Sequence, residues 1–241
     1  MAAALHRALE ERPPGGATRW TRLNHRGGSV SLLAGPALAA AVTATSRVPW
    51  PVAAVSGLGA GALGAYDDLA GSGGARGFRG HVAALRGGTV TTGLVKVAGI
   101  GAAGLLAAAA LRRRPGDVLV DGALIAGTAN LLNLLDLRPG RALKVGTLVA
   151  VVSGEVGVAG ACAALLPADL GERTMLGDTG ANALGAVLGA AVADRLPRRG
   201  ARMAVLAAVA ALTAASEVVS FSAVIDRTPV LRRLDQLGRR P

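Results

Sequence analysis

Residues 117–136 read DVLVDGALIAGTANLLNLLD, a long apolar run whose end carries Asn130, Asn133 and Asp136. A helix needs about 20 mostly apolar residues to cross a bilayer, and this run is close to that length. Similar apolar segments recur along the chain, at 29–46, 50–66, 89–111, 143–166, 180–194 and 203–221. The pattern predicts an all-α fold, a polytopic integral membrane helix bundle.

The composition also favours lipid over water as the solvent of this chain. Its 241 residues are 51% hydrophobic and 17% charged and include 35 glycines, and the mean hydropathy is +0.47. The net charge of +11 could indicate nucleic acid, but aromatic residues make up only 2% of the chain, so stacking platforms are missing. Anionic membrane lipids are therefore the expected partners, and nucleic acid is not. The single cysteine, Cys162, excludes an internal disulfide and a cysteine-based zinc site.

The segment 143–166 has two interpretations because Ser153, Gly154 and Glu155 interrupt it. It forms either one long helix with a buried acid or two short helices that turn at Glu155. With the turn, and with the N-terminus inside, the predicted cytoplasmic loops hold about twice as many Lys and Arg residues as the outer loops, Arg112–Arg114 being the exception. This arrangement predicts about eight spans with both termini cytoplasmic.

Three polar clusters then meet at the cytoplasmic ends of apolar segments. They are Asp67 and Asp68 in AYDDLAG, the Asn130, Asn133 and Asp136 series in NLLNLLD, and Asp178 in MLGDTGAN. Carboxylates and carboxamides are costly inside a bilayer, so their gathering at one membrane face indicates a shared polar site. Asp117, Asp121, Glu155 and Asp194 are instead expected at solvated helix ends.

Each cluster also has a simpler structural interpretation. Asp67 and Asp68 could hold a divalent cation or accept a proton, or be solvated helix-end acids. The asparagines could bind a base or ribose, or hydrogen-bond a neighbouring helix. Asp178 or Thr179 could cap a helix whose free N–H groups face an anion, or form a plain N-cap. Lys96 could reach a phosphate or extend to the membrane interface.

The order of these motifs resembles that of a known family. AYDDLAG, GFRGHVAALRGGTVTTGLVK, NLLNLLDLRPGRA and GERTMLGDTGANALG are similar to the motifs of the polyprenyl-phosphate N-acetylhexosamine-1-phosphate transferases, which include phospho-N-acetylmuramoyl-pentapeptide transferase. The resemblance extends from NHRGG at 24–28 to the tail. It implies transfer of a sugar 1-phosphate from a UDP-sugar to undecaprenyl or decaprenyl phosphate, with release of UMP, for cell-envelope polysaccharide synthesis. It also implies Mg²⁺, which Mn²⁺ can replace.

The resemblance assigns a role to each motif residue. Asp67, Asp68 and Asp136 are the implied catalytic residues, and Asp178 and Asp68 the implied metal ligands. The implied place of action is the cytoplasmic face of a bacterial plasma membrane, in a multi-pass protein that is compatible with a homodimer. The implied substrate-binding residues are Lys96, Asn130, Asn133, Gly177, Thr179 and Asn182.

The chain also departs from the family pattern. Gly71 and Pro139 stand where the family commonly has further acidic or basic residues, and its histidine-rich loop is missing, because the only histidines are His6, His25 and His81. An alternative is therefore a catalytically silent relative that binds polyprenyl phosphate or scaffolds envelope enzymes. A small transporter would explain the intramembrane polar groups but not the ordered motifs.

The expected domain organisation has three parts. Residues 1–28 form a cytoplasmic N-terminal segment, residues 29–226 a transmembrane catalytic domain, and residues 227–241 a basic amphipathic cytoplasmic tail. In the tail, Val230, Leu231, Leu234 and Leu237 share one helical face, as expected of a helix on an anionic membrane surface. Its arginines are hypothesised to help bind the donor diphosphate.

Overall fold

The computed structural model describes residues 1–71, 80, 84–111 and 114–240. Within these residues the chain forms twelve α-helices and one short antiparallel hairpin, which confirms the all-α prediction. Parts of the GFRGHVAALRGG stretch, and Arg112 and Arg113, lie outside the described residues. The elements are α1 (Ala2–Glu11), the 3₁₀ helix η1 (Ala17–Trp20), β1 (Thr21–Leu23), β2 (Ser29–Ser31), α2 (Ala34–Thr45), α3 (Trp50–Ala53), the π-helix η2 (Ala54–Leu58), α4 (Gly59–Ala70), α6 (Thr92–Ala110), α7 (Pro115–Leu135), α8 (Arg141–Val152), α9 (Val156–Leu170), α10 (Gly177–Arg195), α11 (Arg199–Ser216), α12 (Phe221–Arg227) and α13 (Pro229–Gln236).

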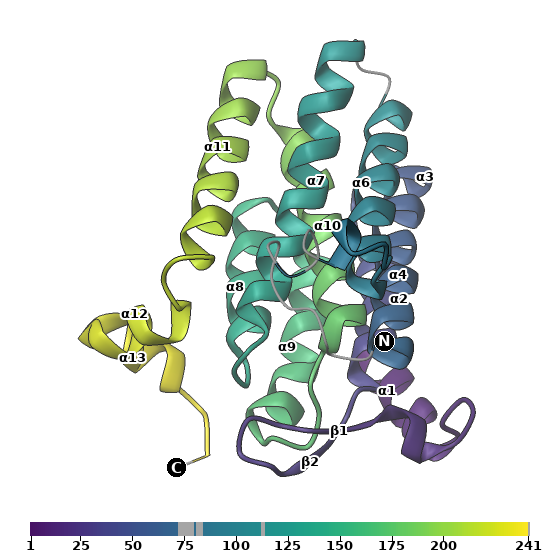
Figure 1. Cartoon of the computed structure of the whole chain (residues 1–241), viewed down its shortest axis with the longest axis vertical. Helices are drawn as coiled ribbons and strands as arrows, with labels where there is room; N and C mark the ends of the chain where they lie inside the picture. Colours follow the sequence, from purple (N-terminus) through teal and green to yellow (C-terminus); the bar gives the residue numbers. More distant parts are fainter. Residues whose placement is uncertain (72–79, 81–83, 112–113, 241) are drawn as a thin grey trace.

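Helix α10 is the centre of the bundle. It packs against α7, α4, α2 and α8, and nearly all of its residues are buried (Figure 1). Its small residues allow this close packing. A Cβ added at Gly185 would lie 2.5 Å from the carbonyl oxygen of Thr128 on α7. A stripe of glycine and alanine therefore lets the neighbouring backbones approach one helix from several sides.

The segment 143–166 is two helices, as the turn at Glu155 predicts. Helix α8 ends at Val152 and α9 begins at Val156. The turn needs Gly154, whose φ is +66°. Glu155, however, is not a solvated tip, because only 1% of it is exposed and its Oε2 accepts hydrogen bonds from Ser46 Oγ (3.1 Å) and from the Arg47 N–H (2.8 Å). The acid thus joins the turn to the end of α2.

The prediction of about eight spans is not met. Among the described residues, α6 and α7 are long and apolar enough to cross a membrane, and α11 with α12 makes a third if this pair, bent by 92°, counts as one span. Helices α2 and α9 are apolar but have only 12 and 15 residues. Helix α10 is long enough, but it begins with polar residues and is surrounded by protein. Apolar segments in the sequence therefore correspond partly to core helices rather than to separate spans.

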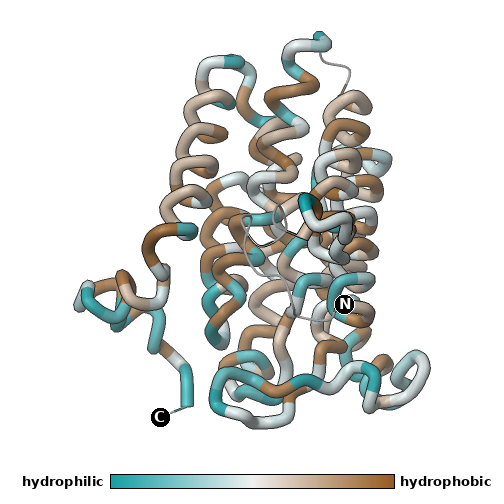
Figure 2. Tube along the Cα trace, viewed as in Figure 1, coloured by the Kyte–Doolittle hydropathy of each residue, from teal (hydrophilic) through white to brown (hydrophobic). Residues whose placement is uncertain are grey.

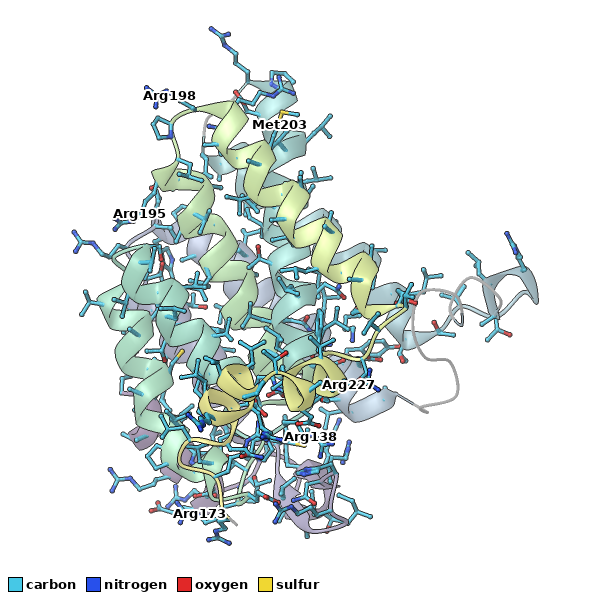
Figure 3. All side chains as sticks on the ribbon, turned by 90° about the vertical axis from the view of Figure 1, so that its left-hand side faces the viewer. Arg138, Arg173, Arg195, Arg198, Met203 and Arg227 are labelled. Atoms are coloured by element: carbon cyan, nitrogen blue, oxygen red, sulfur yellow. The ribbon has the colours of Figure 1, made fainter. Side chains whose placement is uncertain are left out.

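The two ends of the bundle differ. Helix α1, the hairpin β1–β2 and the tail α12–α13 gather at one end, where hydrophilic residues concentrate, while apolar residues cover much of the helices (Figures 1 and 2). Figure 3 shows Arg138, Arg173 and Arg227 toward this end and Arg195, Arg198 and Met203 toward the other. We call the first the hairpin end.

The opposite end is held by a buried ion-pair cluster. The Arg202 guanidinium, 2% exposed, lies 2.7 Å from Asp121 Oδ1 and also pairs with Asp117. Asp121 is fully buried, so the expectation of a solvated helix end is wrong for this residue. Burying a charge is costly without a partner, and Arg202 on α11 supplies that partner to α7.

Candidate functional site

The start of α10 joins the predicted polar clusters. Asp68, at the end of α4, accepts hydrogen bonds from the Asp178 N–H (3.0 Å), the Thr179 N–H (2.9 Å) and the Thr179 hydroxyl (2.6 Å). The first N–H groups of a helix have no acceptor within the helix, and here a carboxylate from another helix satisfies two of them. Asp136, which follows α7, accepts from the N–H of Gly177.

This convergence requires glycine at two positions. Gly177 has a φ of +60°, and a Cβ there would lie 2.9 Å from Asp68 Oδ2. Gly64 on α4 faces the same turn, where a Cβ would lie 2.3 Å from the Asp178 carbonyl oxygen. The glycines therefore allow α4 to approach the start of α10 closely enough for its carboxylate to reach the backbone.

Lys96 completes the cluster from α6. Its ammonium nitrogen lies 2.8 Å from Asp67 Oδ2 and also hydrogen-bonds the Asp178 carboxylate, while its side chain is 14% exposed. The predicted residues Asp67, Asp68, Lys96 and Asp178 thus form one connected group. It comes from the last turn of α4, the first turn of α10 and the first turns of α6.

The carboxyl groups of this site lie beyond the apolar segments, and their environments shift their pKa values. Burial and the hydrogen bond with Asp67 raise the pKa of Asp178 to about 6, against the charge of Lys96, which lowers it. Burial, followed by the negative charges of Asp169 and Asp68, raises the pKa of Asp136 well above its ordinary value. The site therefore favours a ligand that brings positive charge near these acids.

An apolar groove opens beside Lys96. It has a volume of about 700 Å³ and is lined mainly by residues of α6, α7 and α11. Its polar groups are Lys96, Asn130, Thr213 and Glu217. Its apolar lining includes Leu94, Val97, Leu134, Leu206 and Val209. The groove therefore combines a long hydrocarbon-like surface with one ammonium group.

Of the predicted asparagines, Asn130 and Asn182 lie near Lys96, whereas Asn133 does not line the same cavities. Asn130 and Asn182 line a smaller cavity of about 210 Å³ together with Lys96. Asn182 also donates to the Asp178 carbonyl oxygen at 2.7 Å. Asn133 is half-buried and lines neither this cavity nor the groove, although its carbonyl oxygen accepts from the Asp136 N–H (3.1 Å). The series in NLLNLLD is thus only partly gathered at the site.

A second, polar pocket contains Asp136. It measures about 440 Å³ and lies between the hairpin and the turns that precede α8 and α10. Asp169 is part of its lining, and burial raises the pKa of this acid to about 6 although the Gly140 N–H donates to it at 2.6 Å. Glu172, at a φ of +51°, accepts from Asn24 Nδ2 at 2.7 Å. The remaining polar lining includes His25, Arg138 and Thr174.

Four residues of this pocket carry no signal that predicted a role for them: Asn24, His25, Asp169 and Glu172. The first two belong to NHRGG, where the resemblance begins, and the glycines directly after polar residues are the signal that points to a turn there. Asp169 and Glu172 lie just before the motif of Asp178. Their contribution depends on the hairpin folding over the α9–α10 turn, where Ser31 pairs with Thr174.

The carboxylates near Lys96 fit a Mg²⁺ ion that is also bound by substrate phosphates. No group of three or more His, Cys, Asp or Glu side chains in the described part of the chain is placed to hold one metal ion. Mg²⁺, however, is often bound by one or two carboxylates together with substrate phosphates. Asp178 and Asp67 approach each other around Lys96 and supply such oxygens, whereas both oxygens of Asp68 already accept from the start of α10. The metal role of Asp68 stays a prediction.

The tail arginines do not form one group. Arg232, Arg233 and Arg240 are exposed. Arg239 instead donates from Nε to the Pro139 carbonyl oxygen (2.9 Å) and from Nη2 to Asp235 (2.7 Å). The hypothesis that these arginines bind a donor diphosphate stays a prediction.

Comparisons of the chain with protein-family models, with curated proteins and with solved structures found no match.

Proposed function

We propose that this protein is a membrane-embedded phosphoglycosyl transferase that moves a sugar 1-phosphate from a UDP-sugar to polyprenyl phosphate, releasing UMP. The observation that carries the proposal is the position of Lys96 at the apolar groove, in contact with Asp67 and Asp178. A polyprenyl phosphate is complementary to this groove, because it combines a long hydrocarbon chain with an anionic head. Its chain would occupy the groove and its phosphate would meet the Lys96 ammonium.

The reaction joins two anions, so charge neutralisation is the main task of the site. An oxygen of the lipid phosphate forms a bond to the β-phosphorus of the UDP-sugar. The bond from that phosphorus to the oxygen bridging the two phosphates breaks, and UMP leaves with this oxygen. Lys96 would offset the repulsion between the phosphates, which is strong in a water-poor groove. Burial would raise the pKa of Asp67, but hydrogen bonds with Asp178 and Lys96 lower it to about 2, so this carboxylate would stay charged and hold the Lys96 ammonium in place.

The start of α10 would hold the diphosphate in place. The carboxamide of Asn182, in the second turn of this helix, lines the small cavity together with Lys96 and would meet a phosphate oxygen there. Asp68 positions this turn through three hydrogen bonds and so keeps Asp178 beside Lys96. A Mg²⁺ ion bound at Asp178 and Asp67 would supply additional positive charge to the phosphates.

The polar pocket of Asp136 is the proposed place of the nucleoside. Asp136, Asp169 and Asn24 offer the acceptors and donors that ribose hydroxyls and a base edge require. One turn links the pocket to the lysine of the groove, since Gly177 donates to Asp136 and the next residue, Asp178, hydrogen-bonds Lys96. Donor and acceptor substrates would therefore approach Asp178 from different sides.

The proposed location is a membrane, with the hairpin end in the cytoplasm. Leu106 on α6 and Leu119 on α7 are 65% and 64% exposed, as expected of side chains that face lipid. Val152 in the α8–α9 turn region is 81% exposed. Exposed apolar side chains of this kind support a bundle embedded in a membrane, in which the shorter helices pack against the candidate spans.

Purified full-length protein tests the proposal when incubated with undecaprenyl phosphate, Mg²⁺ and a panel of UDP-sugars, with UMP and lipid-diphosphate-sugar as the readouts. We expect both products with at least one donor and a loss of about 100-fold or more in Asp178→Asn. Asp194→Asn is the matched control, because Asp194 is exposed at the other end of the same helix. Absence of UMP with every donor, or equal UMP from Asp178→Asn, would reject the enzyme.

The alternative is a silent relative that only binds polyprenyl phosphate. Gly71 and Pro139, which stand at positions where the family commonly has charged residues, favour it. It predicts saturable binding of undecaprenyl phosphate, weakened by Lys96→Met, with no UMP from any donor. The same incubation therefore separates the two functions.

A further inference from the structure

The chain changes direction sharply after α11. Helices α11 and α12 are bent by 92° across a break at 217–220, so the tail leaves the direction of the candidate span and runs across it at the hairpin end (Figures 1 and 3). A helix that turns in this way where a span ends is placed to lie along a membrane surface.

The outer face of α13 is apolar with a basic border. At about 100° per residue, Val230, Leu234 and Leu237 fall on the side opposite Asp235. They are 66%, 58% and 68% exposed. Arg233 is exposed beside them, and Arg232 is exposed further round the helix. Exposed leucines next to arginines match a surface with hydrocarbon beneath anionic headgroups, because each part of the helix then meets its complement.

The inner face of α13 is fixed to the start of α8. Asp235, 8% exposed, accepts from Arg141 Nε (2.9 Å) and Nη2 (3.1 Å). Lys144 Nζ donates to the carbonyl oxygens of Leu234 (3.0 Å) and Asp235 (2.8 Å). A two-point contact between a carboxylate and a guanidinium fixes orientation as well as position.

Arg141 lies directly after the loop 137–140, which follows Asp136. The tail also touches the loop itself, where Arg239 donates to the Pro139 carbonyl oxygen. The loop also lines the polar pocket through Leu137, Arg138 and Pro139. The tail therefore contacts one wall of this pocket from outside.

We propose that residues 221–240 are an anionic-lipid-dependent clamp. Its outer face binds acidic headgroups, and its inner face holds the loop 137–140 through Arg239 and the adjoining Arg141 through Asp235. A lipid surface is favoured over a protein partner because the tail continues from a candidate span and the exposed Arg233 borders its apolar face. The clamp requires no turnover, so it stands or falls independently of the transferase.

The first measurement locates the outer face. Full-length Leu234→Cys protein, in a Cys162→Ala background and labelled with an environment-sensitive fluorophore, is reconstituted into phosphatidylcholine vesicles with or without phosphatidylglycerol. Quenching by nitroxide-labelled lipid is expected to be several-fold stronger when phosphatidylglycerol is present. Gln236→Cys is the matched control, since its exposed side chain points away from the apolar face, and it should stay weakly quenched.

The second measurement follows the loop by hydrogen exchange of residues 137–144. Exchange is expected to be several-fold slower with phosphatidylglycerol, and Arg232→Glu/Arg233→Glu should abolish both this protection and the quenching. Asp235→Asn should keep the quenching but lose the protection, which distinguishes a clamp from a simple anchor. Equal quenching in both lipid mixtures, or loop exchange that ignores lipid composition, would overturn the proposal.

Discussion

Asp68 holds Thr179 through two contacts, accepting from its N–H at 2.9 Å and from its hydroxyl at 2.6 Å. These residues come from helices far apart in the chain, and their contact fixes the start of α10 against the end of α4. The site geometry therefore depends on a carboxylate that joins two helices.

Replacement of Asp68 should lower the stability of the protein, because Asp68 joins α4 to α10 at the hairpin end. Asp68→Ala leaves the N–H groups of Asp178 and Thr179 without their acceptor, and we expect a loss of about 2–3 kcal/mol in the free energy of unfolding. Denaturant unfolding in detergent measures it. Thr179→Ser keeps the hydroxyl and should cost far less, so equal stability of Asp68→Ala and Thr179→Ser would contradict this role.

Gly177 should not tolerate a side chain. Gly177→Ala introduces a Cβ at a φ of +60° and 2.9 Å from Asp68 Oδ2, and we expect destabilisation of about 1 kcal/mol or more, seen as a lower midpoint of thermal unfolding. Gly200→Ala is the control, because nothing lies within 4 Å of its added Cβ in helix α11. A Gly177→Ala protein as stable as the Gly200→Ala protein would refute the argument.

Removal of the Lys96 charge should reduce turnover more strongly than it reduces stability. Lys96→Met leaves Asp67 and Asp178 facing each other without a cation, and UMP formation is expected to fall by about 100-fold or more. Arg198→Met removes a charge at the opposite end and should retain full activity (Figure 3). Retained activity in Lys96→Met would exclude Lys96 as the phosphate-binding group.

The cluster at the opposite end should behave as a buried ion pair. Asp121→Ala leaves the Arg202 guanidinium buried beside Asp117 alone, which should cost about 3 kcal/mol or more. The double variant Asp121→Leu/Arg202→Met replaces both charges by apolar groups and should recover part of the loss. Chemical unfolding of the three proteins measures the coupling, and a double variant less stable than Asp121→Ala would argue against it.

Acid should release the tail. Burial alone would raise the pKa of Asp235, but the hydrogen bond from Arg141 and the charges of Arg141 and Arg239 lower it below its ordinary value. A lowered folded-state pKa stabilises docking above the unfolded carboxyl pKa of about 4, and this contribution is lost as the pH falls through the folded-state value. Proteolysis after Arg232 and Arg233 should therefore accelerate below about pH 4, and Asp235→Asn should be cleaved rapidly at neutral pH as well.

Local sequence signals predicted the parts of this structure that depend on local chemistry. The small polar residues at 153–155 predicted the turn between α8 and α9, and the Asp67–Asp68 and GDTGAN motifs predicted groups that the fold brings together. Hydropathy could not separate candidate spans from core helices, because α10 is apolar where it packs against other helices of the protein. The partners of Glu155 and Asp121 were also hidden, since Ser46 and Arg202 lie far from them in sequence.

The contacts of Asp68 have a consequence for how the region can vary. Two of its three donors are peptide groups, which every residue except proline carries. The side chain at position 178 could therefore be exchanged, and the chemistry retuned, without disturbing the anchoring of α10 to α4. Divergent copies of this architecture could share an unchanged framework while differing in the reaction they perform.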